Sequence, residues 1–211
     1  MALSEPSSFN PYLPPQSGGD DRPSPERGRL RRAYLAWIFG GLNGITVFAL
    51  ALTHVVDYSD STAILWELIK KVDGIFALLR LAVVGLWIHT AWSDVPLETR
   101  EELHVTPGKA VGFLFIPFVN IYWIFAMPRR LCVALDRALI VRGGAASAPV
   151  VVALLAPALH LVHGIASKTT EGLPVLMSFT VTGALWFVFM LRCDRARAEL
   201  LIVLDALPVR Q

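Results

Sequence analysis

Residues 107–127 read PGKAVGFLFIPFVNIYWIFAM, an apolar segment that Pro117 and Asn120 interrupt near its middle. A proline inside a helix removes a backbone hydrogen-bond donor and clashes with the preceding turn. Before this proline, a helix over residues 110–116 would reach only about 10 Å into a bilayer. We therefore expect a re-entrant segment that dips into the membrane and returns on the side it entered from. A kinked but continuous span is the alternative.

The composition of the rest of the chain is typical of a membrane protein. Of 211 residues, 55% are hydrophobic and 17% are charged, whereas soluble proteins carry about 25% charged residues. Crossing the hydrocarbon core takes about 20 apolar residues. The sequence predicts such spans over residues 33–56, 73–92, 148–167 and 173–191. The expected fold class is an all-α integral membrane protein with four transmembrane helices, the Pro-broken segment and cytoplasmic amphipathic helices.

The positions of the positive charges favour four spans over five. With four spans and the N-terminus inside, nearly all of the 19 Lys and Arg residues lie inside; the exceptions are Lys70, Lys71 and Lys168 outside and Arg80 within the membrane. Five spans would place about half of them outside, against the positive-inside rule. We therefore predict a multi-pass protein of the cell inner membrane with both termini cytoplasmic.

Two domains follow from this pattern. Residues 1–28 are rich in proline and predict a disordered cytoplasmic tail, which could also dock a protein partner. Residues 29–211 form the helical membrane domain. Within it, residues 63–69 predict a short interfacial helix in the outer loop. Residues 128–142 predict another that begins at Pro128, with a leucine row on one face: Leu131, Leu135 and Leu139. The C-terminal segment is expected to continue the last helix along the inner surface.

Three short motifs resemble a known family. They are Leu86-Trp87-Ile88, residues 106–112 (TPGKAVG) and residues 115–120 (FIPFVN). With them, residues 86–136 resemble an uncharacterised bacterial membrane family, domain-of-unknown-function family 4328, in which a Phe-Ile-Pro-x-x-Asn core follows a Ser-Pro-Gly-like entry at the same distance. The chain departs from that pattern after Trp87, where the family carries Arg and Asn. The resemblance supports the fold and implies no activity.

Arg80 is the main candidate for a functional residue. It lies near the middle of the second span, where a charge is costly and needs a partner. Asp73 is about 10 Å away along the helix, too far for a direct contact. We therefore expect Arg80 to donate to the Pro117–Asn120 tip, either as a structural clamp or as part of a substrate site. The candidate core set is Arg80, Pro107, Gly108, Pro117, Asn120 and Trp87. Trp87 and Trp92 are also expected to mark the membrane interface.

Three histidines form a second candidate set: His54 at the end of the first span, with His160 and His163 at i, i+3 on the third. Facing imidazoles from two helices can ligate haem or a metal, with His54 as one ligand. Hydrogen bonding between helices is the simpler interpretation. We predict no cofactor and no metal.

Gly40 and Gly44 form a GxxxG pair in the first span. Small residues at this spacing let helices approach closely, within the monomer or in a homo-oligomer. The net charge of +2 gives no reason to expect nucleic-acid binding. The leading hypothesis is a non-catalytic structural or regulatory protein of the lipid bilayer. A small channel or transporter built around the re-entrant segment and Arg80 is the alternative, and a haem or metal redox protein is a weaker one.

Overall fold

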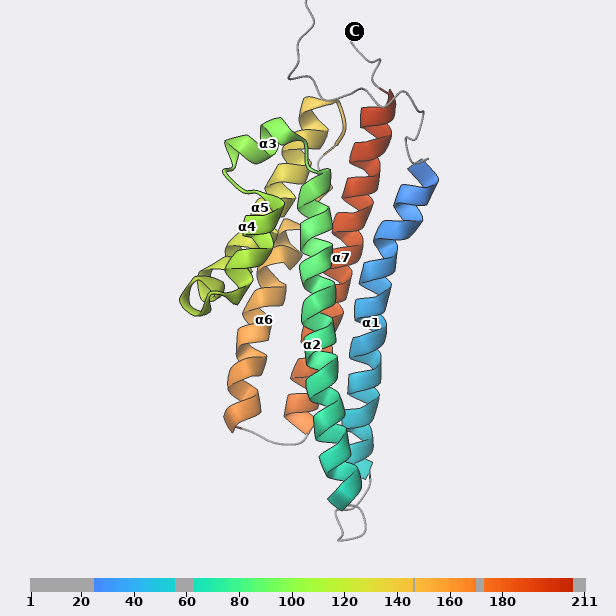
Figure 1. Ribbon diagram of the computed structural model, residues 1–211, viewed down its shortest axis with the longest axis vertical. Helices are drawn as coiled ribbons and strands as arrows, with labels where there is room; N and C mark the ends of the chain where they lie inside the picture. Colours follow the sequence, from blue (N-terminus) through green and yellow to red (C-terminus); the bar gives the residue numbers. More distant parts are fainter. Residues whose placement is uncertain (1–24, 56–62, 146, 170–172, 207–211) are drawn as a thin grey trace, which may run out of the picture.

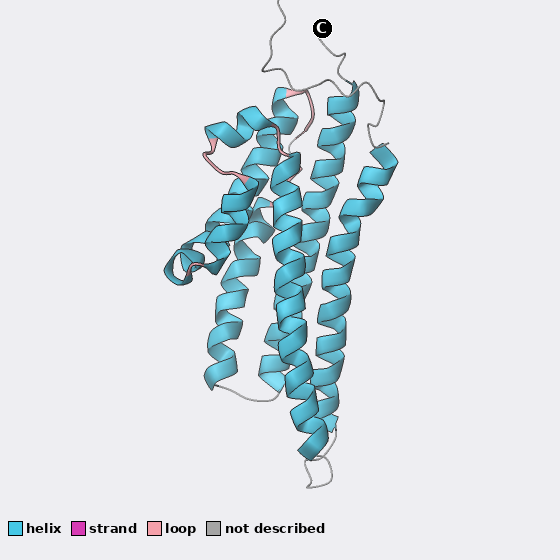
Figure 2. Ribbon diagram, viewed as in Figure 1, coloured by secondary structure: helices cyan, strands magenta, loops and turns pink. Residues whose placement is uncertain are grey.

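The computed structural model describes residues 25–55, 63–145, 147–169 and 173–206, and every regular element in these residues is helical (Figures 1 and 2). The predicted Pro-rich tail lies mostly outside the described residues. Its boundary at residue 28 is wrong, because the first helix already begins at Pro25.

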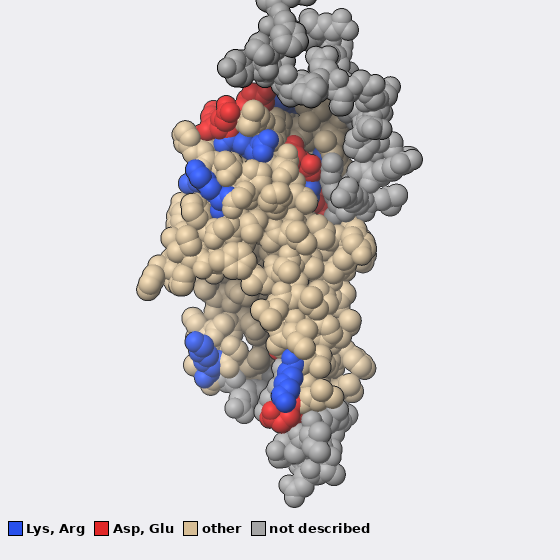
Figure 3. All heavy atoms as spheres, viewed as in Figure 1, with Lys and Arg blue, Asp and Glu red and all other residues tan. Residues whose placement is uncertain are grey.

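Within the described residues, four helices are long and apolar enough to cross a membrane, as predicted. They are α1 (Pro25–Val55), α2 (Ala63–Asp94), α6 (Val150–Thr169) and α7 (Leu173–Ala206). α7 packs against both α1 and α6, and α2 packs against α1. In Figure 1, α1 and α6 lie on opposite sides of α7. Lys and Arg side chains lie toward the two ends of the molecule in Figure 3, and the middle is uncharged on this face.

The segment that contains the predicted break at Pro117 forms a helical hairpin between α2 and α6. It follows the short α3 (Leu97–Glu102) and consists of α4 (Pro107–Gly112), the 3-10 turn η1 (Phe113–Phe115) and α5 (Pro117–Val141). The break falls at the predicted proline: Ile116 is extended (φ −94°, ψ 112°), and Pro117 occupies the first turn of α5. A missing N–H costs nothing in a first turn. α5 returns to the end of the bundle where α4 begins (Figure 1).

Two predicted helix boundaries are wrong, at Pro128 and in residues 63–69. α5 runs from Pro117 straight through Pro128, so no separate helix begins there. Its leucine row (Leu131, Leu135, Leu139) is buried in the protein instead of lying on a membrane surface; an apolar stripe has the same period in either place. Residues 63–69 are the first turns of α2. The C-terminal segment does continue the last helix, but as an unbroken extension of α7 whose Cys193, Ala196 and Leu200 are buried in the core.

Aromatic side chains near the ends of the long helices lie either on the surface or in the core. Tyr34 and Trp37 are exposed, as an interface belt requires. Trp87 and Trp92 are fully buried, so the expectation that they mark the interface is wrong. They belong to the core that α2 shares with its neighbours, together with Phe189 and Met190 of α7.

Candidate functional site

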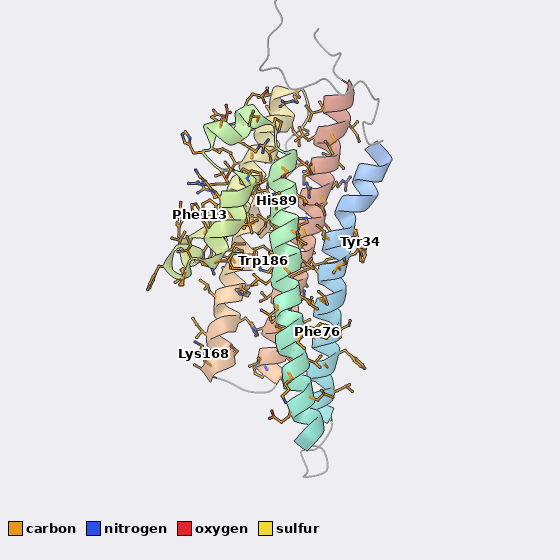
Figure 4. The ribbon with its side chains drawn as sticks, viewed as in Figure 1. Tyr34, Phe76, His89, Phe113, Lys168 and Trp186 are labelled. Carbon is orange, nitrogen blue, oxygen red and sulfur yellow. The ribbon has the colours of Figure 1, made fainter. Side chains whose placement is uncertain are left out.

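The candidate site is a cavity of about 360 Å³ in the middle of the bundle. Figure 3 shows the surface hollowed between α6 and α2, below the α4–α5 hairpin. Trp186, one of the lining residues, lies in the middle of the bundle in Figure 4. Most of the lining is apolar. The polar and charged lining residues are Asn43, Arg80, Asn120, His160, His163 and Thr182.

Four residues singled out in the sequence therefore line one cavity: Arg80, Asn120, His160 and His163. They come from α2, α5 and α6, which the chain separates by up to 83 positions. The bundle brings them together because the hairpin packs through α4 against α2 and through α5 against α6 (Figure 1). Sequence analysis placed Arg80 beside the Pro117–Asn120 tip and grouped His160 with His163, but it did not predict that the two sets share a site.

Arg80 has different partners from those expected. Its guanidinium donates to Thr46 Oγ1 on α1 and, through Nη2, to Asp73 Oδ1 at 3.4 Å. Its Cζ lies 5.2 Å from the centre of the Phe179 ring on α7. The predicted donation to the Pro117–Asn120 tip is wrong, and so is the exclusion of Asp73. An arginine on a helix leans toward the helix N-terminus, which brings a carboxylate two turns back within reach.

The hydroxyl of Thr46 completes this arrangement. It accepts from Arg80 and donates to the Leu42 carbonyl oxygen at 3.0 Å. The guanidinium is thereby anchored to α1, α2 and α7 at once, with its side chain 12% exposed. The Asp73 contact is long for a charge-assisted bond, which typically measures about 2.7–2.9 Å. Arg80 can therefore engage a further acceptor within the cavity that it lines.

His163 is held by a hydrogen bond to α7. Its Nδ1 lies 2.8 Å from Ser178 Oγ, and that hydroxyl lies 2.9 Å from the Val175 carbonyl oxygen. The hydroxyl has a single proton, so Nδ1 donates when Ser178 donates to the carbonyl and accepts when Ser178 donates to the ring. The ring also makes an edge contact with Phe179 at 5.4 Å. Phe179 thus connects the two polar groups of the cavity, because Arg80 lies against the same ring.

Asn43 and Thr182 are cavity residues that sequence analysis missed. The Asn43 amide donates to the Phe39 carbonyl oxygen at 2.9 Å, and Thr182 Oγ1 donates to the Leu159 carbonyl oxygen at 3.3 Å. A Cβ on Gly183 would lie 2.9 Å from Asn43 Oδ1, so this glycine permits the close approach of α7 to α1. Polar residues inside an apolar span were the available signal.

The hairpin is held by a residue that was also missed. Trp123 of α5 donates through Nε1 to the Ala110 carbonyl oxygen of α4 at 2.8 Å, and its ring contacts Phe113 at 5.0 Å. Pro107 starts α4, whose Thr106 cap accepts from the Lys109 backbone N–H. Gly108 has open space where a Cβ would be. Pro107 is the first residue of α4, and packing gives no reason for glycine at position 108.

Packed aromatic side chains border the cavity on the side of Trp186. Trp186 lines the cavity and contacts Phe189, which in turn contacts Trp87; both pairs have ring centroids 5.7 Å apart. Trp87 Nε1 donates to Asp194 Oδ1 at 2.9 Å. Trp87 therefore has a structural role, although not at the membrane interface.

Beyond these rings lies a buried ionic cluster of Arg197, Asp94 and Asp194. The guanidinium is 0% exposed and donates to Asp194 at 2.6 Å and, through Nε, to Asp94 at 3.1 Å. The cluster ties α7 to the end of α2. In the sequence, Arg197 looked like one more member of the cytoplasmic basic segment, so its burial was not predicted.

The structure gives no support to the haem or metal hypothesis. The structure does not describe the side chain of His54. This residue belongs to α1, whereas His160 and His163 belong to α6, and α7 lies between these two helices. Among the described residues, no group of three or more His, Cys, Asp or Glu side chains could hold a metal ion.

No protein-family model, no curated protein and no solved structure matches the chain. The resemblance of residues 86–136 to domain-of-unknown-function family 4328 stays a prediction.

Proposed function

We propose that the chain is a non-catalytic, multi-pass protein of the bacterial inner membrane that binds a small acidic amphiphile in the cavity. The observation that carries this proposal is the convergence of Arg80, Asn120, His160 and His163 on one otherwise apolar cavity. Ligand sites in proteins are mostly apolar and carry a few convergent polar groups. A regulatory role through such a ligand fits the non-catalytic hypothesis.

The ligand class follows from the charge and shape of the site. A volume of about 360 Å³ is at the lower end of the range of about 300–1,000 Å³ that ligand pockets occupy. The apolar walls suit an alkyl chain. The planar guanidinium of Arg80 suits a carboxylate, which it can bind through two parallel hydrogen bonds. The hollow between α2 and α6 (Figure 3) gives such a molecule a lateral route from the bilayer.

The membrane arrangement is part of the proposal. We infer four spans with both termini cytoplasmic and a re-entrant α4–α5 hairpin. Exposed apolar side chains at the hairpin tip support a re-entrant position, because lipid would cover them there. These side chains are Phe115, Ile116, Phe118, Ile121 and Tyr122. The family resemblance belongs to the same proposal, since its Phe-Ile-Pro-x-x-Asn core coincides with the chain reversal.

A transporter is the second candidate. Broken helices that line a cavity recur in secondary transporters, and here the hairpin contributes Leu114, Asn120 and Ile124 to the cavity. The packed rings of Trp186, Phe189 and Trp87 favour a closed binding site over an open pore. Uptake of a labelled fatty acid into the lumen of proteoliposomes, above that of protein-free vesicles, would favour the transporter.

Fluorescence quenching tests the binding function. Bromine-tagged decanoate should quench tryptophan emission saturably in the nanodisc-embedded protein, because Trp186 lines the cavity. Arg80→Gln should weaken binding roughly tenfold, the effect of losing about 1.4 kcal/mol at a charge-assisted contact. Lys71→Gln is the matched control, since it removes a charge from an exposed position of the same helix.

The neutral analogue decides whether the charge matters. Bromine-tagged decanol should bind the unaltered protein more weakly than bromine-tagged decanoate does. The two probes should bind Arg80→Gln with equal affinity. Equal binding of both probes to the unaltered protein, or quenching that rises linearly as in empty nanodiscs, would exclude the proposed site.

A further inference from the structure

We infer that a second pocket, between α3 and α4, binds the phosphate headgroup of an anionic phospholipid. This α3–α4 pocket has a volume of about 450 Å³, and its lining includes Leu97, Arg100, Glu101, His104, Thr106 and Lys109. It shares no lining residue with the central cavity. It lies at the base of the hairpin, at the end of the bundle that carries α3 (Figure 1).

Arg100 is the reason to expect an anion there. Its Nε is buried and has no hydrogen-bond partner in the part of the chain that the structure describes. A guanidinium cannot lose its charge, and a buried donor without an acceptor is costly. Arg100 also lines the α3–α4 pocket, so an oxygen-rich anion there would balance the charge of a guanidinium whose Nε has no acceptor in the protein.

The neighbouring carboxylates are already engaged elsewhere. Glu98 and Glu102 flank Arg100 on α3, but each forms an ion pair with α5: Glu98 with Arg142 at 3.9 Å, and Glu102 with Arg137 at 2.6 Å. Glu101 lines the pocket, and so does the exposed Lys109 of α4. Arg100 and Lys109 therefore outnumber the single carboxylate that faces the pocket, which leaves it suited to one anionic group.

The pocket is preformed by backbone hydrogen bonds. Val105 N donates to the Arg100 carbonyl oxygen at 3.2 Å, and His104 N donates to the Glu101 carbonyl oxygen at 3.1 Å. Thr106 Oγ1 accepts from Lys109 N at 3.2 Å. These bonds hold α3 and α4 on either side of a short loop. A phosphate headgroup can therefore bind Arg100 and Lys109 without the entropy cost of ordering the backbone between them.

The apolar surroundings indicate a lipid phosphate and not a soluble one. Leu97 lines the pocket and is exposed, and the hairpin that starts at the pocket carries exposed Phe115 and Phe118 at its tip. A headgroup bound by Arg100 and Lys109 can thus place its acyl chains along the hairpin. Basic pockets at the cytoplasmic side of membrane proteins attract anionic lipids in this way.

Lipid binding to the detergent-purified full chain tests this inference. Native mass spectrometry should detect dioctanoyl phosphatidylglycerol bound at least about tenfold more tightly than dioctanoyl phosphatidylcholine. Arg100→Gln and Lys109→Gln should each weaken phosphatidylglycerol binding by roughly tenfold. Glu101→Gln should strengthen it, because it removes the one carboxylate facing the pocket. Arg195→Gln is the matched control: its side chain lies near the same end of the bundle, is 81% exposed and is paired with Glu199.

Three outcomes would contradict the inference. Equal binding of the two lipids, or an equal loss in Arg195→Gln, would mean a non-specific charge effect. Inorganic phosphate that raises the melting temperature as much as phosphatidylglycerol would mean a soluble phosphate site. If Arg100→Gln does not fold, the exposed positions Lys109 and Glu101 decide the test. Arg100→Gln and Lys109→Gln should leave quenching by bromine-tagged decanoate unchanged, because neither residue lines the central cavity, so failure here is distinct from failure of the cavity proposal.

Discussion

Arg80 and Arg197 show how differently two arginines on apolar helices can satisfy their donors. Arg197 is fully buried between two carboxylates, Asp94 and Asp194. Arg80 has a hydroxyl, an aromatic ring and one long carboxylate contact. The fully paired arginine therefore serves the packing of α2 against α7. The incompletely paired one faces a cavity and is the residue we expect to meet a ligand.

Removing Arg197 should destabilise the protein strongly. Arg197→Leu leaves two carboxylates close together without their cation, a change that typically costs about 3–5 kcal/mol. Arg195→Leu, on the same helix but exposed, should change the free energy of unfolding by less than about 0.5 kcal/mol. Thermal unfolding in detergent, followed by circular dichroism, compares the two. Similar melting temperatures for both variants would show that the buried cluster does not hold α7 to α2.

At the scale of elements, the two glycines of the GxxxG pair serve different surfaces. A Cβ on Gly40 would lie 2.9 Å from the Phe187 ring of α7, so this glycine permits the packing of α1 against α7. Gly44 meets nothing within 4 Å. The close approach predicted within the monomer therefore involves Gly40 alone, and an oligomer through both residues stays a prediction.

Leucine substitutions separate these roles. Gly40→Leu should lower the free energy of unfolding by about 1–3 kcal/mol, because the larger side chain must displace Phe187. Gly44→Leu should leave the monomer as stable as before or slightly more stable, since leucine favours helix more than glycine does. Thermal unfolding checks both, and size-exclusion chromatography with light scattering reports any oligomer. Loss of an oligomer in Gly44→Leu would assign that glycine to a contact between chains.

The arrangement of the whole molecule predicts the sidedness of its ends. The last residues of α1 and α6 and the first residues of α2 and α7 lie at one end of the bundle, and α3 lies at the other (Figure 1). Lys71 and Lys168 lie near the first end, and most arginines lie toward the second. By the positive-inside rule, the arginine-rich end should be cytoplasmic.

Single cysteines test this topology in intact cells. Lys71→Cys and Lys168→Cys should react with a membrane-impermeant maleimide added outside, whereas Ser93→Cys and Ser147→Cys should react only after permeabilisation. Cys132 and Cys193 can stay in place, because both are buried. External labelling at position 147 would contradict the four-span topology.

The sequence by itself determined the membrane class, the four apolar helices and the break at Pro117. Each rests on local chemistry: a span needs about 20 apolar residues, and a proline disrupts the turn before it wherever that turn lies. It also marked Arg80, Asn120, His160 and His163 as unusual, because polar groups are costly in an apolar span.

Only the tertiary structure decided what these residues contact. Arg80 binds Thr46 and Asp73 instead of the hairpin tip, Trp87 is buried beside Asp194, and the row through Leu135 packs inside the protein. Hydrophobic period and residue type are the same whether a helix faces lipid or another helix. The partners of a buried polar group depend on which helices are neighbours, and here that follows from the way α7 packs between α1 and α6.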